Sequence, residues 1–272
     1  MSSFVNRFGS EIRDEFNRSK NTLGIPYEEI VSATNNFAVE NQLAAGSSSS
    51  GKWYRAQLPV ALLESEEKTM IDILVRELKV TEDAYTEMAI AYYLKHENIG
   101  SLLYWTADTV NVFFVYKIEA NGSLDEHLHS TAGLTWTQRL SICIGVGRAL
   151  KYIHDSDFVQ PGYYVIHGNI KSSLISLDDS WQPKLQGFEL PDATVAQRNT
   201  LHLTGKYKGT LQYKDPAYEK SGALTAKSDV FSFGVVLFEV LFGRSASTPP
   251  NGDPQADDDW NFAEFARSRW KK

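Results

Sequence analysis

Apolar residues recur at helical spacing in two parts of this chain, residues 124–128 and residues 136–154. Intervals of three and four residues place these side chains on one side of a helix. Gly122 and Gly133 interrupt the pattern and mark turns around the two segments. A chain of 272 residues has the length of one two-lobed domain or of two small domains.

The longest apolar run covers residues 230–242, and Ser232 and Glu239 interrupt it. A membrane-spanning helix needs about 20 apolar residues, so this run is too short to cross a bilayer. We therefore expect it to form the buried central helix of a helical lobe.

The first 24 residues carry a pattern of their own, because Phe4, Phe8, Ile12 and Phe16 recur every four residues. Charges of both signs fill the other positions, which indicates an amphipathic helix. Such a helix packs on its own domain or on a partner protein. A membrane contact is the third alternative, and it is the least favoured because membrane-surface helices are rich in Lys and Arg.

The net charge of −7 comes from 27 basic and 34 acidic residues, which argues against a broad surface for nucleic acid or anionic membranes. The single cysteine, Cys143, excludes an internal disulfide and fits a reducing compartment. It shares a helical face with Leu140, Gly147 and Leu150, so we expect a core thiol. We see no targeting or spanning segment and expect a cytoplasmic protein, peripheral to the plasma membrane only through a partner.

A series of motifs extends from residue 25 almost to the end of the chain. They are IPYEEIVSATNNF (25–37), FVYKIEANGSLDEHL (114–128), VIHGNIKSSLI (165–175), KLQGFEL (184–190), GTLQYKDPAY (209–218) and SDVFSFGVVLFEVLFGR (228–244). In content and order they resemble the landmarks of protein kinase domains of the plant receptor-like type, which phosphorylate Ser and Thr.

The resemblance implies an α+β, two-lobed protein-kinase-like fold for residues 25–272, preceded by the extension 1–24. A small strand-rich lobe with one long helix is expected at about 25–118, and a mainly helical lobe at about 121–272. The sequence stops after the helix that follows the central helix. The helices that usually complete the large lobe are therefore missing from it.

The catalytic positions of the family are replaced. The catalytic loop of a kinase reads His-Arg-Asp, four residues, then Asn. Here His167 is followed by Gly168 and Asn169, and Leu174 takes the later Asn position. Gly187 replaces the aspartate of Asp-Phe-Gly. An amide cannot act as a base and neither leucine nor glycine ligates Mg²⁺, so we expect no catalytic residue and no magnesium here.

The nucleotide-binding positions persist as remnants. The resemblance assigns them to Gly46, Ser48, Gly51, Arg76, Glu87, Tyr116 and Glu119. The serine-rich loop at 47–50 either covers a phosphate or forms an ordinary turn. Either Leu74 or Arg76 occupies the place of the strand lysine, and an Arg76–Glu87 ion pair follows from the second alignment.

Scaffold positions of the family are retained. His167 and Phe188 match residues that stack in its internal hydrophobic spine, and Asp229 matches the aspartate that anchors the catalytic loop. The resemblance thus implies a catalytically inactive kinase homologue that binds a protein partner, namely an active kinase or a receptor complex. Two alternatives stay open: an atypical Ser/Thr kinase whose metal is held near Glu189 with Arg76, and an ATP sensor without turnover.

Overall fold

A computed structural model describes residues 25–43, 51–59, 70–79, 94–128, 133–155, 163–188, 194–197, 202–203 and 209–246. The chain divides into two compact units. The first comprises residues 1–95 and 100–119, and the second comprises residues 96–99 and 120–272. The predicted helix in residues 1–24, Gly46, Ser48, Glu87 and Glu189 lie outside the described residues.

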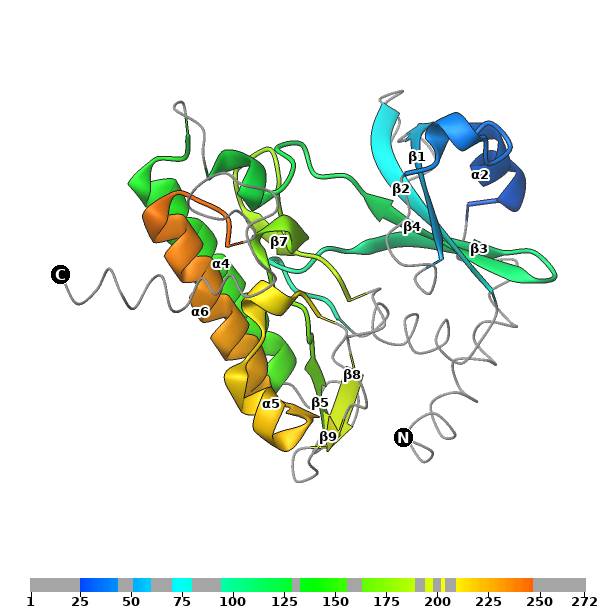
Figure 1. The fold of residues 1–272 in the computed structure, drawn as a ribbon. Coiled ribbons are helices and arrows are strands. Elements are labelled where there is room, and N and C mark those ends of the chain that lie inside the picture. Colours follow the sequence, from blue (N-terminus) through cyan, green and yellow to red (C-terminus); the bar gives the residue numbers. More distant parts are fainter. Residues whose placement is uncertain are drawn as a thin grey trace. The chain divides into compact units, whose positions relative to one another are not determined.

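The first unit is built on one antiparallel sheet in the strand order β1-β2-β4-β3 (Figure 1). The strands are β1 (Lys52–Pro59), β2 (Met70–Lys79), β3 (Leu102–Ala107) and β4 (Asn111–Lys117). Two helical segments precede them, α2 (Tyr27–Ala33) and the 3-10 turn η1 (Val39–Asn41).

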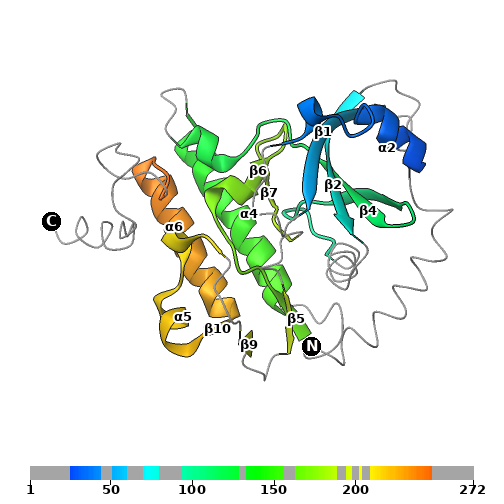
Figure 2. The ribbon, with the colours of Figure 1, turned by 45° about the vertical axis from the view of Figure 1, so that its right-hand side comes forward.

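Both faces of this sheet carry apolar side chains, because successive strand residues point to opposite sides. On one face, Ile73, Val75 and Phe113 pack against Ile30 of α2, which lies next to β1 (Figure 2). The ring of Phe37 stacks on Phe113 with centroids 5.0 Å apart. The opposite face has a second core, whose buried members are Val112, Phe114 and Tyr116.

The second unit combines helices with short strand pairs. Its helices are α4 (Trp136–Asp155), α5 (Pro216–Ser221) and α6 (Ala226–Phe242), with 3-10 turns η4 (Leu124–His127), η5 (Ser172–Leu174) and η6 (Leu211–Tyr213). Its strands are β5 (Tyr163–Ile166), β6 (Ile175–Leu177), β7 (Pro183–Leu185), β8 (Thr194–Gln197), β9 (His202–Leu203) and β10 (Ala223–Leu224). They pair as β5–β8, β6–β7 and β9–β10. A strand-rich unit and a mainly helical unit are the α+β organisation that the sequence predicts.

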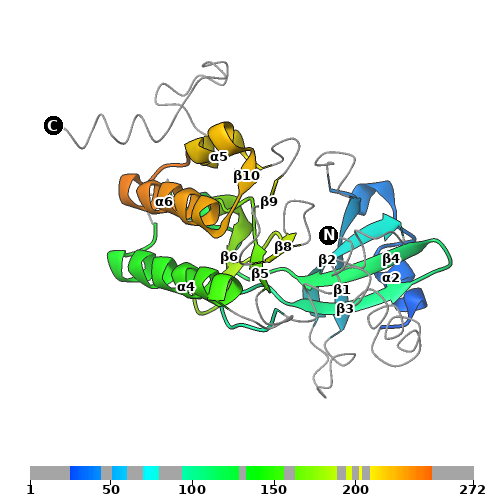
Figure 3. The ribbon, with the colours of Figure 1, turned by 90° about the horizontal axis from the view of Figure 1, so that it is seen from below.

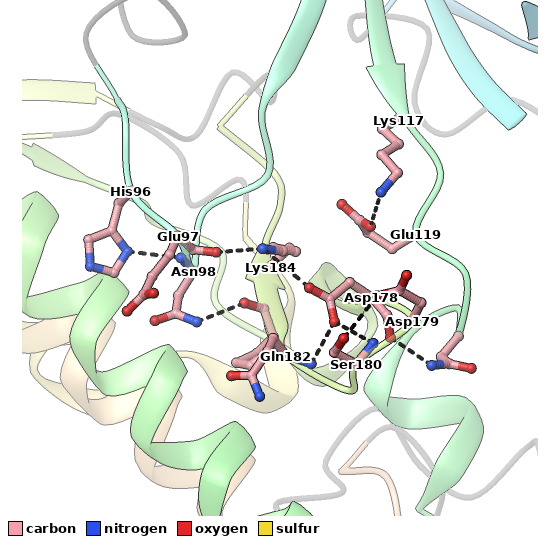
Figure 4. Close-up of polar contacts among 12 residues, drawn as sticks. His96, Glu97, Asn98, Lys117, Glu119, Asp178, Asp179, Ser180, Gln182 and Lys184 are labelled. Atoms are coloured by element: carbon pink, nitrogen blue, oxygen red, sulfur yellow. Dashed lines mark hydrogen bonds and ion pairs between the residues drawn. The ribbon is translucent and has the colours of Figure 1, made fainter. Parts of the chain in front are cut away.

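Residues 96–99 belong to the second unit, whereas the sequence placed them within the small lobe. The cause is their bonding to β7 (Figure 4). The backbone N–H of Leu185 donates to the carbonyl oxygen of Asn98 at 2.9 Å, and the Asn98 amide donates to the carbonyl of Pro183 at 3.1 Å. These non-local bonds cannot be predicted from the local pattern of the chain.

Helices α4 and α6 lie side by side and antiparallel (Figure 3). The Arg139 guanidinium on α4 donates to the carbonyl of Val240 at 2.7 Å and so satisfies an acceptor at the end of α6. No helix within the described ranges is long and apolar enough to cross a membrane.

The expected helix at residues 230–242 is present within α6, but it is buried on one side only. Helix α6 buries one side, but its other side exposes large apolar residues, and so does α4. We call these the outer face: Trp136, Leu140 and Ile144 of α4, with Val230, Leu237, Phe238, Leu241 and Phe242 of α6. Leu140 is 60% exposed, so it does not share a core with Cys143, which is itself only partly buried. Helical periodicity identified an apolar stripe but not what covers it.

Gly145 and Gly147 of α4 provide a matched test of the packing around this helix. A Cβ at Gly145 would collide with the Pro183 ring and lie 2.9 Å from Asn98 Nδ2. We expect Gly145→Ala to lower the free energy of unfolding by about 1–3 kcal/mol through overpacking. At Gly147 the nearest atom, Phe233 Cε1, is 3.9 Å away, so Gly147→Ala should add about 0.5–1 kcal/mol of helix stability. Urea unfolding measures both, and equal effects would contradict the packing at Gly145.

Candidate functional site

The loop at residues 167–169 is held by the carboxylate of Asp229, in the first turn of α6. Asp229 is 1% exposed. Its Oδ2 accepts the backbone N–H of His167 at 2.9 Å, and its Oδ1 accepts that of Gly168 at 2.8 Å. His154 Nε2 lies 2.9 Å from the same Oδ2. The N-terminal end of a helix dipole favours a negative charge at this position. Asp229 therefore anchors this loop, as the resemblance implies.

The imidazole of His167 is fully buried and serves as a structural group. Its Nδ1 accepts the backbone N–H of Asn169 at 3.2 Å, so Nε2 carries the proton and donates to the carbonyl of Gln186 at 2.7 Å. Burial lowers the pKa of His167, against the opposing influence of Asp229. The ring meets Phe188 edge to face at 4.9 Å, which is the stacking that the sequence predicts for this pair.

Asn169 holds a neighbouring segment with its side chain. The amide is 8% exposed, and its Oδ1 accepts both the backbone N–H of Thr210 at 3.1 Å and the Thr210 hydroxyl at 3.0 Å. A neutral amide oxygen accepts such bonds without being basic enough to remove a proton from an alcohol. The side chain that stands where the resemblance expects the catalytic base thus holds Thr210 through two hydrogen bonds.

Gly187 and Leu174, which the resemblance assigns to the two metal-ligand positions, lie close to each other. Gly187 has φ of +99°, a backbone conformation in which side chains are strained. A Cβ at this glycine would lie 2.9 Å from Leu174 Cδ1 and 3.0 Å from His167 Cε1. A Cβ at position 187 would therefore require Leu174 or His167 to shift.

These residues do not fit a magnesium ion. Magnesium requires oxygen ligands in octahedral array, and Leu174 and Gly187 offer no side-chain oxygen. Among the residues that the structure describes, no three His, Cys, Asp or Glu side chains are grouped to hold a metal. Glu189, the candidate ligand from the sequence, lies outside those residues.

Arg76 is the buried cation on the strand that should carry lysine. It is 2% exposed, and its guanidinium carbon lies 5.3 Å from the centroid of the Trp53 ring. Leu74 stands two residues earlier on the same face and pairs with Tyr116. Strand alternation therefore does not separate the two alignments, but only Arg76 supplies a charge. The predicted partner Glu87 lies outside the described residues.

Trp53 is a residue that the sequence reasoning missed. It faces Arg76 in the register of β1 and β2, and its ring centroid lies 6.0 Å from that of Tyr116. The signal in the sequence was a bulky aromatic residue two positions after Gly51. Gly51 follows the serine-rich segment and has a φ of +77°. A Cβ at Gly51 would collide with the carbonyl oxygen of Glu77, so the backbones approach closely there.

The remaining predicted position, Glu119, ends the first unit. It is buried to 8% exposure, and its Oε2 lies 3.2 Å from Lys117 Nζ, a pair visible in Figure 4. The described site residues thus fall into two groups. His167, Gly168, Asn169, Leu174 and Gly187 come together in the second unit, whereas Gly51, Arg76, Tyr116 and Glu119 belong to the first.

A buried polar network also escaped the sequence reasoning. Glu239 of α6 is fully buried, and its Oε1 accepts the Tyr213 hydroxyl and the backbone N–H of Ala246, each at 2.6 Å. Burial raises the pKa of Glu239, and burial with the nearby Glu239 carboxylate raises the pKa of Tyr213. The Ser232 hydroxyl donates to the carbonyl of Tyr213 at 2.7 Å, so α6 holds η6 at two points.

Comparison with known proteins identifies the same family over most of the chain. Residues 62–267 match the family model described as protein kinase domain. The chain is 34% identical to the Arabidopsis thaliana receptor-like protein kinase HERK 1 over 254 residues, which cover 91% of this chain and 28% of that protein.

Two further Arabidopsis thaliana relatives are similar at the same level. Receptor-like protein kinase FERONIA is 34% identical over 251 residues, covering 90% of this chain and 26% of FERONIA. Serine/threonine-protein kinase-like protein CCR4 is 36% identical over 230 residues, covering 80% of this chain and 30% of CCR4. The chain therefore spans less than a third of the length of these relatives.

Restoring the metal-ligand aspartate tests the packing of Leu174 on Gly187. We expect Gly187→Asp to lower the free energy of unfolding by about 2 kcal/mol or more, because of the positive φ and the Leu174 contact. Leu174→Ala in the same chain removes that contact, so the double variant should lose less than the sum of the single variants. Urea unfolding of the four proteins gives the coupling, and strictly additive losses would contradict the packing.

The pH dependence of stability tests the role of His167. Its lowered pKa means that the unfolded chain binds a proton below about pH 6.5 while the folded chain does not. The contribution of His167 to the free energy of unfolding is therefore fully present above this pH and is lost progressively as the pH falls below it. Nitrogen NMR of the folded protein should show that the His167 ring stays neutral, with its proton on Nε2, to a lower pH than an exposed histidine does. A His167 ring that becomes charged at the same pH as an exposed histidine, or at a higher pH, would refute this.

Proposed function

The chain belongs to the protein kinase family, and we propose that it is a catalytically inactive member of the receptor-like type. In this role it binds an active kinase or a receptor complex and takes part in intracellular signalling without transferring phosphate. The observation that carries the proposal is the contact between Leu174 and Gly187, because both metal-ligand positions have become apolar and their space is filled.

Phosphoryl transfer depends on positioning and on neutralising charge at the transferred group. The general base, the main metal ligand and the second metal ligand correspond to Asn169, Gly187 and Leu174. Each electrostatic element of such a site contributes a few kcal/mol to stabilising the transition state. Their joint replacement supports loss of activity more strongly than any single change.

The scaffold supports a binding role. The bonds of Asp229 to His167 and Gly168, and the contact of His167 with Phe188, keep the shape of the loop although its chemistry is replaced. The outer face of α4 and α6 adds exposed apolar side chains of the kind that pack against other protein segments. The anchored loop and the exposed apolar outer face are both features that a binding protein would use.

An atypical kinase is the less favoured alternative. It would need Arg76 to contact the phosphates, and the Trp53 ring lies over that guanidinium. It would also need Glu189 to replace ligands from two other positions. No contact among the described residues supports such an arrangement.

A phosphate-transfer assay tests the proposal. The purified chain is incubated with labelled ATP and Mg²⁺, alone and with a general Ser/Thr substrate, beside an active receptor-like kinase domain. We expect no incorporation above that of the Asn169→Ala variant of this chain, because Asn169, Leu174 and Gly187 supply neither a base nor a metal ligand. Incorporation by the wild-type chain that Asn169→Ala abolishes would overturn the proposal.

The same assay examines the binding role. We expect the chain, added without label, to change the rate at which the active receptor-like kinase domain phosphorylates its substrate. The Gly145→Ala variant, destabilised in the second unit, and heat-denatured chain serve as controls for a folded requirement. No rate change and no complex on gel filtration with such domains would argue against this part of the proposal.

A further inference from the structure

We propose that Trp53 closes the nucleotide side of the first unit, so that the wild-type chain does not bind ATP and removal of this one side chain restores binding. This inference deepens the proposed function and rests on its assignment of the kinase family. It concerns nucleotide binding, which an inactive kinase either keeps or loses, and it therefore stands or fails separately from the absence of phosphate transfer.

The first step is the register of the sheet. Trp53 of β1 pairs with Arg76 of β2, and antiparallel partners have their Cβ atoms within about 5.5 Å of one another on the same face. The indole consequently lies over the guanidinium, with the guanidinium carbon 5.3 Å from the ring centroid. This is the distance range of a cation–π contact.

The second step is the charge. In kinases a cation on this strand contacts the α- and β-phosphates, beneath a glycine-rich loop that covers them. Arg76 is the cation that this strand offers on the matching face, and it is 2% exposed. Trp53 is half-buried, stands two residues after Gly51 in the sequence and pairs with Arg76 across the sheet. Its ring therefore covers the face of Arg76 that lies toward β1.

The third step is the space for the base. Trp53 extends toward Tyr116 on β4, with ring centroids 6.0 Å apart, and Leu74 of β2 pairs with Tyr116. Trp53, Leu74 and Tyr116 belong to one apolar cluster on this face of the sheet. The indole is a bicyclic aromatic of about the size of a purine base. The sheet thus presents its own aromatic ring where an adenine would need a flat apolar surface.

Together these contacts describe a nucleotide surface that is occupied from within. Arg76 lies over the face of the Trp53 ring, and the Tyr116 ring is tilted by 36° against it. A bound ATP would have to displace the indole from both. Valine, which is small and favours strands, would leave β1 intact and uncover Arg76 and Tyr116.

Calorimetric titration with ATP, in the presence and absence of Mg²⁺, tests the inference on the full chain. The proteins are wild type, Trp53→Val, Trp53→Phe and the double variant Trp53→Val with Arg76→Gln. We expect no saturable binding by wild type or Trp53→Phe, which keeps an aromatic ring in place. Trp53→Val should bind ATP saturably, and the added Arg76→Gln should weaken that binding at least about tenfold.

Each other outcome overturns the inference. Saturable binding by the wild type would show that the indole does not exclude the nucleotide, and this arm does not depend on whether any variant folds. A folded Trp53→Val, verified by circular dichroism and thermal unfolding, that binds no better than the wild type would show that Trp53 is not the obstacle. ATP binding by the wild type without phosphate transfer would refute this inference alone. Phosphate transfer by the wild type would refute the proposed function as well.

Discussion

The buried carboxylate of Asp229 is the constraint on which the second unit depends. It accepts the backbone N–H groups of His167 and Gly168, which would otherwise be buried without partners. Leaving such donors unpaired costs on the order of 1–3 kcal/mol each. The position of His167 follows from these bonds, and with it the stacking on Phe188 and the bond to the Gln186 carbonyl. Asp229 binds backbone atoms of this loop, so the anchor does not depend on which side chains the loop carries.

The replaced positions have acquired packing roles of their own. Asn169 holds Thr210 through two hydrogen bonds, and Leu174 fills the space beside Gly187. In the first unit, Trp53 lies on the buried Arg76. Substitutions that only removed a catalytic side chain would leave unpaired polar groups or voids, and both are unfavourable in a protein interior. In each of these three places the new side chain makes a specific contact instead.

Several of these contacts were accessible from the sequence, because the family resemblance assigns partners to its motif residues. The resemblance placed Asp229, His167 and Phe188 in the contacts that they make. Other parts depend on non-local pairing. Residues 96–99 join the second unit through bonds to β7, 85 residues further along for the pair of Asn98 and Pro183. Trp53 was overlooked because its meaning lies in its partners on β2 and β4, which adjoin it only once the sheet has formed.

By itself, the sequence determined the family and the two-lobed α+β fold, and it predicts the replacement of the acidic and amide side chains that phosphoryl transfer requires. These conclusions need only residue identity at known motif positions. The tertiary structure alone decided that Leu174 obstructs position 187, that Trp53 covers Arg76 and that one side of α6 is exposed. The physical reason is that steric exclusion and burial depend on distances between residues far apart in the chain. The spacing of residues in the sequence does not give those distances directly.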